Sequence, residues 1–243
     1  MRLLDITLDL ETCSLSSHAA IMQIAAVAWD RFSKDDSQMF FGKALKPEDT
    51  EHFVRTIDLN SQFVEGLFDF DQNTAKWWGK QSRESKLAVA EDITSAEVKT
   101  EKQSQALLNE ALAELDDWIR QLLSKYNVDN FCIWCQGTDF DIPILRYAAE
   151  STRCNKLLPM ALHHKYFRDC RTAIYECVAA WLGRTTEDVP YTKVDLLKGP
   201  TLAYKILPQL PESFGGSENA HGALYDCVRS SWFTWQALRL IFL

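Results

Sequence analysis

Apolar and polar residues alternate along the first stretch of the chain, residues 3–12. Because strand side chains point alternately to two faces, this stretch predicts a β-strand with one apolar and one polar face. The apolar face carries Leu4, Ile6, Leu8 and Leu10, and the polar face carries Asp5, Thr7, Asp9 and Glu11. Two carboxylates end the polar face, and like charges held this close favour a divalent cation between them. A polar face that simply meets water is the alternative, and the pattern alone leaves both open.

Two further strands are expected soon after the first. Residues 21–29 form an almost uninterrupted apolar run, and residues 40–45 form another one after a polar turn at 34–37. Three strands joined by short loops predict an antiparallel meander that begins with the acidic strand.

The rest of the chain alternates between helical and strand patterns. Apolar residues at helical spacing predict a packing helix over residues 106–126. The other expected elements are a helix over 75–81 with its N-cap in 71–74, a strand over 131–135, a helix beginning near 141, a short strand over 166–171, a helix over 172–182 ended by Gly183, and a last helix through 242. This order predicts an α/β fold with a mixed sheet flanked by helices.

One domain over residues 1–243 is expected, because a chain of this length forms one large core. The polar and charged residues 91–105 are predicted to be a mobile loop, with a linker between two domains as the alternative. An apolar share of 47%, with eight tryptophans, supplies enough material for that core.

The net charge is −8, from 26 Lys and Arg against 34 Asp and Glu. This balance argues against a protein that coats nucleic acid non-specifically, but not against an enzyme that holds nucleotides through bound cations. Seven scattered cysteines argue against a secreted disulfide framework. The N-terminal residues lack a signal-peptide core, and no apolar run is long enough to span a bilayer, so we expect a cytoplasmic protein without a membrane partner.

Two more carboxylates stand out further along the chain. Asp141 follows the expected strand 131–135, beside a helix start, where an acid is also common without any ligand. Asp226 lies five residues after His221 on an otherwise apolar helix. Burying an unpaired charge there is costly, so Asp226 is expected either to bind a metal or to pair with Arg229.

Three motifs in this order resemble those of the DEDDh 3′-to-5′ exonucleases of the RNase H-like superfamily. The motifs are LDLET with Asp9 and Glu11, GTDFDIPIL with Asp141, and HGALYD with His221 and Asp226. The resemblance is strongest to the branch that includes bacteriophage exonuclease A, because TAKWWGKQS and RDCRTAI resemble its inserts. It runs from about residue 3 to residue 235, and it implies an RNase H-like mixed sheet, an antiparallel meander followed by parallel strands.

The resemblance also implies the roles of these residues in a two-metal phosphodiesterase that uses Mg²⁺ or Mn²⁺. Asp9 would bridge the two ions, Glu11 and Asp226 would hold the ion that binds the attacking water, and Asp141 would support the second ion. His221 would accept a proton from the water, and a loop histidine with a surface hydrogen bond is the alternative. The partner would be a nucleic acid with a free 3′ end, and the product a nucleoside 5′-monophosphate; a homodimer is left open.

Contacts to the substrate are predicted partly from the resemblance, which points to Thr12 and Cys13, and partly from the aromatic and basic residues themselves. Thr12 and Cys13 would meet the terminal nucleotide, and Phe140 would pack on its sugar or base. Trp77 would stack on a base, with Trp78 beside it and Lys76, Lys80 and Arg83 near the phosphates; alternatively, at least one tryptophan anchors its helix in the core.

Several further points stay open at this stage. Arg168, Asp169 and Arg171 either border the site or form structural ion pairs, whereas the C-x-x-C of Cys132 and Cys135 is read as buried free thiols. A DNA exonuclease is favoured; the alternatives are an exoribonuclease and a catalytically idle nucleic-acid-binding module on the same fold.

Overall fold

The computed structural model describes residues 3–41, 50–63, 66–90, 107–154, 163–185, 204–214 and 221–242. These residues contain a five-stranded sheet in the order β3-β2-β1-β4-β5. The strands are β1 (Leu3–Thr12), β2 (Ile21–Trp29), β3 (His52–Thr56), β4 (Asn130–Cys135) and β5 (Phe167–Asp169). β1, β2 and β3 pair antiparallel, whereas β4 is parallel to β1 and β5 is parallel to β4. The mixed sheet predicted from the sequence is confirmed.

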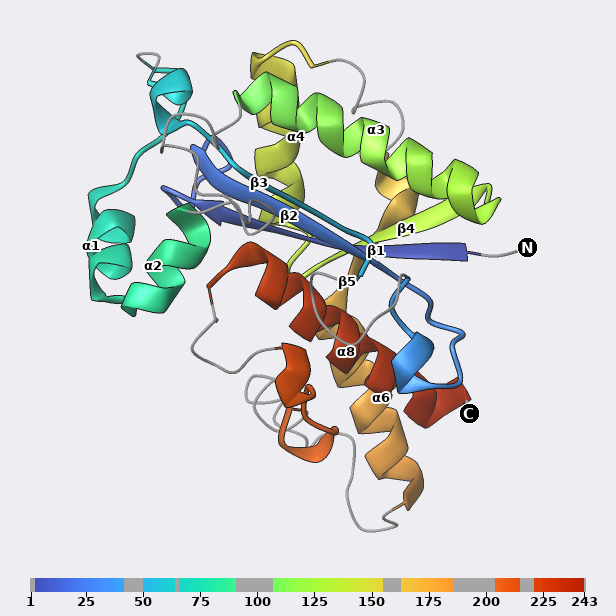
Figure 1. Cartoon of the computed structure of the whole chain (residues 1–243). Helices are drawn as coiled ribbons and strands as arrows, with labels where there is room; N and C mark the ends of the chain where they lie inside the picture. Colours follow the sequence, from blue (N-terminus) through green and yellow to red (C-terminus); the bar gives the residue numbers. More distant parts are fainter. Residues whose placement is uncertain are drawn as a thin grey trace.

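Helices cover both faces of the sheet (Figure 1). The apolar face of β1 packs with α3 (Leu108–Tyr126) and α4 (Asp141–Ser151) in one core cluster. The opposite face packs with α6 (Cys170–Thr185) and α8 (Ala223–Phe242) in a second cluster. The predicted stripe of α3 is the face that it buries, because residues three and four apart share one side of a helix.

A hairpin of two short helices stands beyond the C-terminal end of β1, at the left in Figure 1. Helix α1 (Gln72–Lys80) begins where the Asp71 carboxylate accepts a hydrogen bond from the Thr74 backbone N–H (2.7 Å), as an N-cap should. Helix α2 (Arg83–Ala90) follows directly. The hairpin, the end of β1 and the start of α8 therefore border the same end of the sheet.

The structure corrects two predicted elements. The third strand of the sheet is β3, which pairs with β2 from Gln23 to Val27. Of the strand predicted at 40–45, the structure describes Phe40 and Phe41, and Phe40 forms an isolated bridge with Trp29. Residues 42–49 and the predicted loop 91–105 lie outside the described residues. Helix α6 continues through Gly183 to Thr185, because a glycine inside a helix costs little more than about 1 kcal/mol.

Most of the polar face of β1 is covered, so the alternative in which it simply meets water is wrong; Asp9, near its end, is half-buried. Asp5 and Thr7 are fully buried on it, since α8 packs against β1 and β2. Among the described helices, none is long and apolar enough to cross a membrane.

Candidate active site

Three carboxylates from two distant segments meet at the C-terminal end of β1. One oxygen each of Asp9, Glu11 and Asp226 lies within 4.8 Å of the others. The first two come from β1, where their i, i+2 spacing places them on one face, and Asp226 comes from the first turn of α8. That turn is fixed on β2, because the Ala223 N–H donates to the Gln23 side chain (3.1 Å) and Cys227 Sγ lies 3.4 Å from the Ala25 carbonyl.

Asp141 reaches the same place from the other side of the sheet, at the start of α4. The turn before it uses Gly137, whose φ of +118° disfavours any other residue, and Phe140 N–H closes the turn onto the Gly137 carbonyl (3.0 Å). Asp141 is buried, and its carboxylate accepts a hydrogen bond from the Leu10 backbone N–H. Of the neighbouring charges, it acts most strongly on Asp9. The structure therefore brings together all four predicted acids.

The protein does not compensate the negative charge that this cluster carries when all four acids are ionised, and their pKa values reflect it. Burial, and then repulsion by Asp141, Glu11 and Asp226, raises the pKa of Asp9 well above its usual range. Burial, followed by the same kind of repulsion from Asp226 and Asp141, raises the pKa of Glu11 to about 9. Burial raises the pKa of Asp141 to about 7 and also raises that of Asp226, although hydrogen bonds oppose it in both.

Arg171 is the cation that lowers the pKa of both Asp9 and Asp141 by its charge. Arg229, the alternative partner that the sequence offers for Asp226, also acts on that acid by its charge. Two guanidiniums do not neutralise four carboxylates. An all-oxygen donor set of this charge, with ligand atoms this close together, fits hard divalent cations such as Mg²⁺ and Mn²⁺.

His221 lies in the turn that leads into α8, in a left-handed backbone conformation with φ of +67°. Its backbone N–H donates to Asp226 Oδ2 (3.1 Å), so the turn is fixed beside the acid cluster. Its ring is half-buried and packs edge-to-face on Trp77, with 4.8 Å between ring centroids. Two residues that the sequence predicts for different roles thus contact each other.

A hollow of about 440 Å³ adjoins the cluster through Glu11. Three predicted substrate contacts line it, namely Thr12, Phe140 and Trp77. Thr12 Oγ1 donates to the Ser14 carbonyl (2.7 Å), so its hydroxyl is already positioned. Cys13 does not line the hollow; its side chain packs partly buried against the core.

The two tryptophans of α1 have different surroundings. Trp78 is half-buried, and its Nε1–H donates to the Thr12 carbonyl (3.2 Å), which ties α1 to the end of β1. Trp77 is 42% exposed and meets Trp78 edge-to-face, with ring centroids 5.1 Å apart. Trp78 thus ties the helix to β1 by this hydrogen bond rather than by insertion into the core, and Trp77 presents its ring to the hollow.

Sequence reasoning missed several residues around the hollow, which are Leu10, Leu15, Asp71, Asn73 and Thr74. Leu15 could have been found from the sequence, because it is a large apolar residue in the expected loop directly after the acidic strand. In the structure its side chain is 79% exposed. The polar residues carry none, since their position depends on how α1 docks.

The sequence leaves the roles of three residues near β5 undecided, and the structure separates those that stabilise local structure from the one that acts on the site. Asp169 accepts from the Thr172 N–H (2.7 Å) at the start of α6, and the Arg168 guanidinium donates to the carbonyls of Lys165 and Phe167, so both stabilise local structure. Arg171 acts on the acid cluster. Cys132 and Cys135 are buried free thiols, as predicted.

A sheet in this order, with acids gathered at the C-terminal end of its central strand, defines an RNase H-like fold with the residue set of the DEDDh 3′-5′ exonuclease class. A family model described as the 3′-5′ exoribonuclease Rv2179c-like domain matches residues 5–232. The chain belongs to this family.

Individual relatives are more distant. An exodeoxyribonuclease of Enterobacteria phage T4 is 27% identical over 154 residues, which are 58% of this chain and 53% of that protein. The chain therefore spans about half the length of this curated relative. Cell-death related nuclease 4 shares 13% identity, with a TM-score of 0.49 over 98% of this chain and 64% of that one. The nuclease domain of 3′hExo, a DEDDh family member bound to rAMP, shares 12% identity, with a TM-score of 0.48 over 98% and 92%.

Proposed function

We propose that this chain is a metal-dependent 3′-5′ exonuclease that removes nucleoside 5′-monophosphates from the 3′ end of DNA. The single observation that carries the proposal is the convergence of four carboxylates whose charge Arg171 and Arg229 compensate only in part. Binding to nucleic acid alone does not call for such a cluster, because it repels phosphates unless cations are present. The idle-module alternative is therefore not retained.

Asp9, Glu11 and Asp226 would hold the cations, with Asp141 supporting them from α4. Two bound cations would stabilise the attacking and leaving oxygens of an in-line displacement at phosphorus. His221 would accept the proton of the attacking water, because an imidazole can do so near neutral pH and its backbone is fixed to Asp226. The terminal nucleotide would occupy the hollow, with Thr12, Phe140 and Trp77 against its sugar and base.

The test is the Asp9→Ala substitution, with Asp226→Ala beside it. Either change should reduce Mg²⁺-dependent shortening of a 5′-labelled strand by more than about a hundredfold, since even outer-shell partners of a metal site cost 10- to 100-fold. Asp129→Ala is the matched control, because Asp129 is exposed next to β4 at the opposite end of the sheet. Full activity in the Asp9→Ala and Asp226→Ala variants would refute the proposal.

RNA is the second candidate substrate, and the description of the matched family favours it, whereas the name of the phage relative favours DNA. The two differ at the 2′-hydroxyl, which a protein reads by contacts at the sugar. Digestion of DNA and RNA strands of identical sequence decides between them: the DNA proposal requires faster shortening of DNA, and faster shortening of RNA replaces it.

A further inference from the structure

The α1–α2 hairpin carries a charge opposite to that of the whole chain. Residues 72–90 contain four cations, Lys76, Lys80, Arg83 and Lys86, against the single anion Glu84, which gives the hairpin a net charge of +3 in a chain of −8. All four cationic side chains are exposed. Among the described residues, no ion pair involves any of them, although Lys76 acts on the Asp71 carboxylate by its charge; the charge of the other three remains available to a polyanion.

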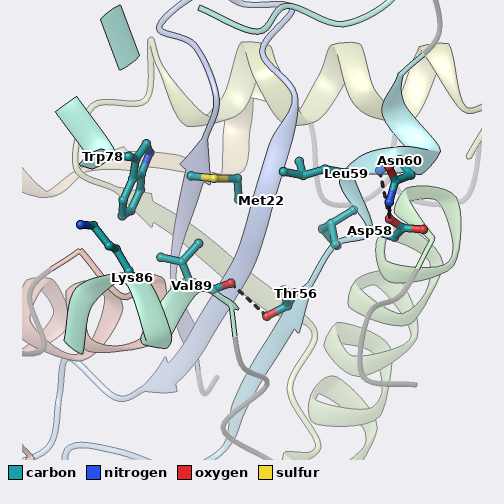
Figure 2. A pocket seen from close by; sticks show the side chains of 9 residues that line it. Met22, Thr56, Asp58, Leu59, Asn60, Trp78, Lys86 and Val89 are labelled. Atoms are coloured by element: carbon teal, nitrogen blue, oxygen red, sulfur yellow. Dashed lines mark hydrogen bonds between the residues drawn. The ribbon is translucent and has the colours of Figure 1, made fainter. Parts of the chain in front are cut away.

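A second cavity, of about 430 Å³, lies beneath this hairpin. Figure 2 shows Trp78, Lys86 and Val89 of the hairpin facing Leu59 and Asn60, with Met22 of β2 between them. The wall contributed by the hairpin is held in place, because Thr56 Oγ1 donates to the Val89 carbonyl (3.3 Å). The catalytic proposal makes no use of this cavity.

Trp78 connects the two cavities. It lines the hollow for the terminal nucleotide and also the second cavity, and its hydrogen bond to the Thr12 carbonyl fixes the ring between them. Groups in van der Waals contact with the two sides of one indole ring lie about 7–8 Å apart. Consecutive bases of a stretched single strand can reach that separation.

The lining of the second cavity suits a base. Met22, Leu59 and Val89 supply apolar contacts, and Trp78 supplies an aromatic ring. Asn60 and Asp58 form a polar rim, where the Asn60 side-chain amide donates to Asp58 Oδ1 (3.0 Å). Lys86 Nζ donates to the Gly79 carbonyl (2.9 Å), which places its charge at the hairpin side of the cavity. A base with a phosphate on either side matches both features, since every base has a face for stacking and every linkage carries one negative charge.

We propose that the hairpin and this cavity form a second nucleotide subsite. The base next to the terminal nucleotide enters the cavity beyond Trp78, and Lys80, Arg83 and Lys86 bind phosphates further along the same strand. The subsite rests on the proposed exonuclease function and makes a single-stranded 3′ end of several nucleotides the preferred substrate.

Two substrates separate this subsite from the catalytic one. The p-nitrophenyl ester of thymidine 5′-phosphate presents only a terminal nucleotide, whereas a DNA strand also presents its neighbours. Removing the base next to the 3′ terminus should lower kcat/KM of the unmodified protein about tenfold, because stacking of one base on an aromatic ring contributes that much. Removing a base near the 5′ end serves as the matched control and should have a smaller effect.

The variant Asn60→Trp fills the rim of the cavity from an exposed position, and Asn60→Ala is its control without added bulk. Asn60→Trp should lower kcat/KM on the intact strand about tenfold relative to the ester, and the penalty for the missing base should disappear. Equal penalties for the missing base in Asn60→Trp and in the unmodified protein would overturn the assignment of the cavity.

The phosphate contacts have their own readout, which is the dependence of KM on salt. Neutralising two of them in Lys80→Gln/Arg83→Gln should reduce the slope of log KM against log salt by about 1.4 for a single strand. The control Lys34→Gln/Lys165→Gln removes the same charge from exposed positions elsewhere and should leave the slope unchanged. An equal change in both double variants would overturn the phosphate contacts.

Failure of the subsite and failure of the exonuclease proposal are distinguishable. If the unmodified protein hydrolyses neither the ester nor the strand in Mg²⁺, the catalytic proposal is wrong and the subsite falls with it. If it hydrolyses both but shows no penalty for the missing base, only the subsite is wrong.

Discussion

The polar face of β1 has two halves that differ in what surrounds them. In the first half, Asp5 accepts hydrogen bonds from Arg31 Nε (2.8 Å) and Trp134 Nε1 (2.7 Å) and forms an ion pair with the Arg31 guanidinium. Thr7 beside it accepts from Trp29 Nε1 (3.0 Å) and Ser231 Oγ (2.7 Å). In the second half, Asp9 and Glu11 face the carboxylates of Asp226 and Asp141.

The difference shows how one strand pattern serves two purposes. Both halves alternate in the same way, but their carboxylates differ in what compensates their charge. Arg31 forms an ion pair with Asp5, whereas the acids at the end of β1 have no arginine or lysine paired with them among the described residues and would need a bound metal ion. A buried charge is tolerated only if it is paired, hydrogen-bonded or bound to a metal. The first half thus stabilises the sheet, and the second half has the charge and spacing that the proposed metal site requires.

The largest expected difference between the halves appears when one carboxylate is neutralised in each of them and no metal is bound. Asp5→Asn should lower the free energy of unfolding by about 3–5 kcal/mol, because it leaves the mostly buried Arg31 without its counter-charge. Asp9→Asn should not lower it, because it removes one of several mutually repelling groups. Urea unfolding in a chelator measures both free energies.

The contrast between the two halves of β1 would be wrong if Asp9→Asn were as destabilising as Asp5→Asn under these conditions. That result would mean that the acid cluster is stabilised by the protein itself, and the argument for an external cation would lose its basis.

The two halves also show how far sequence reasoning reaches. The strand, its alternation and the acids at its end follow from neighbouring residues, and so do the α3 stripe and the start of α4. The partner of Asp5 does not, because Arg31 lies 26 residues further along the chain and meets it only through the register of β1 and β2. The third strand cannot be located from neighbouring residues for a similar reason, because the local pattern does not show which segment pairs with the edge of β2.

The candidate site also contains residues that the sequence identifies and residues that only the tertiary structure reveals. The motifs named the acids, and packing of α8 on β2 brings Asp226 to Asp9 and Glu11. The hollow and the second cavity depend on how the hairpin docks through Trp78. No local pattern specifies that contact, so most residues of the second cavity, and those of the hollow that the motifs do not include, were found only in three dimensions.

A smaller effect is expected from adding the cation. Mg²⁺ at about one hundred times its Kd should raise the free energy of unfolding by about 2.7 kcal/mol, and Asp9→Asn should abolish the increase. Asp5→Asn, in the other half, should retain the increase on its lower baseline. Thermal unfolding with and without Mg²⁺ measures the shift, and an equal shift in Asp9→Asn would place the cation elsewhere.

The same site predicts how stability depends on pH without metal. The pKa of Glu11 is about 9 in the fold and 4.5 ordinarily, so the folded protein holds a proton there that the unfolded chain releases. Its contribution to stability is complete below about pH 4.5 and is lost as the pH rises towards about 9. Mg²⁺ requires the ionised carboxylates, so the stabilisation by Mg²⁺ should grow over the same interval. Unfolding at several pH values, with and without Mg²⁺, checks both slopes.

The smallest expected effect concerns Thr7, the neutral member of the first half. Thr7→Val keeps the shape but removes the acceptor of the buried Trp29 N–H, which should cost about 1.5 kcal/mol. Thr7→Ser keeps the hydroxyl and should retain most of the hydrogen-bond contribution. Urea unfolding of the two variants separates loss of the hydrogen bond from loss of packing. If Thr7→Val instead abolished the response to Mg²⁺ while Thr7→Ser did not, the two halves would be coupled through this hydroxyl, and the division of the strand into a structural and a ligand-binding half would be wrong.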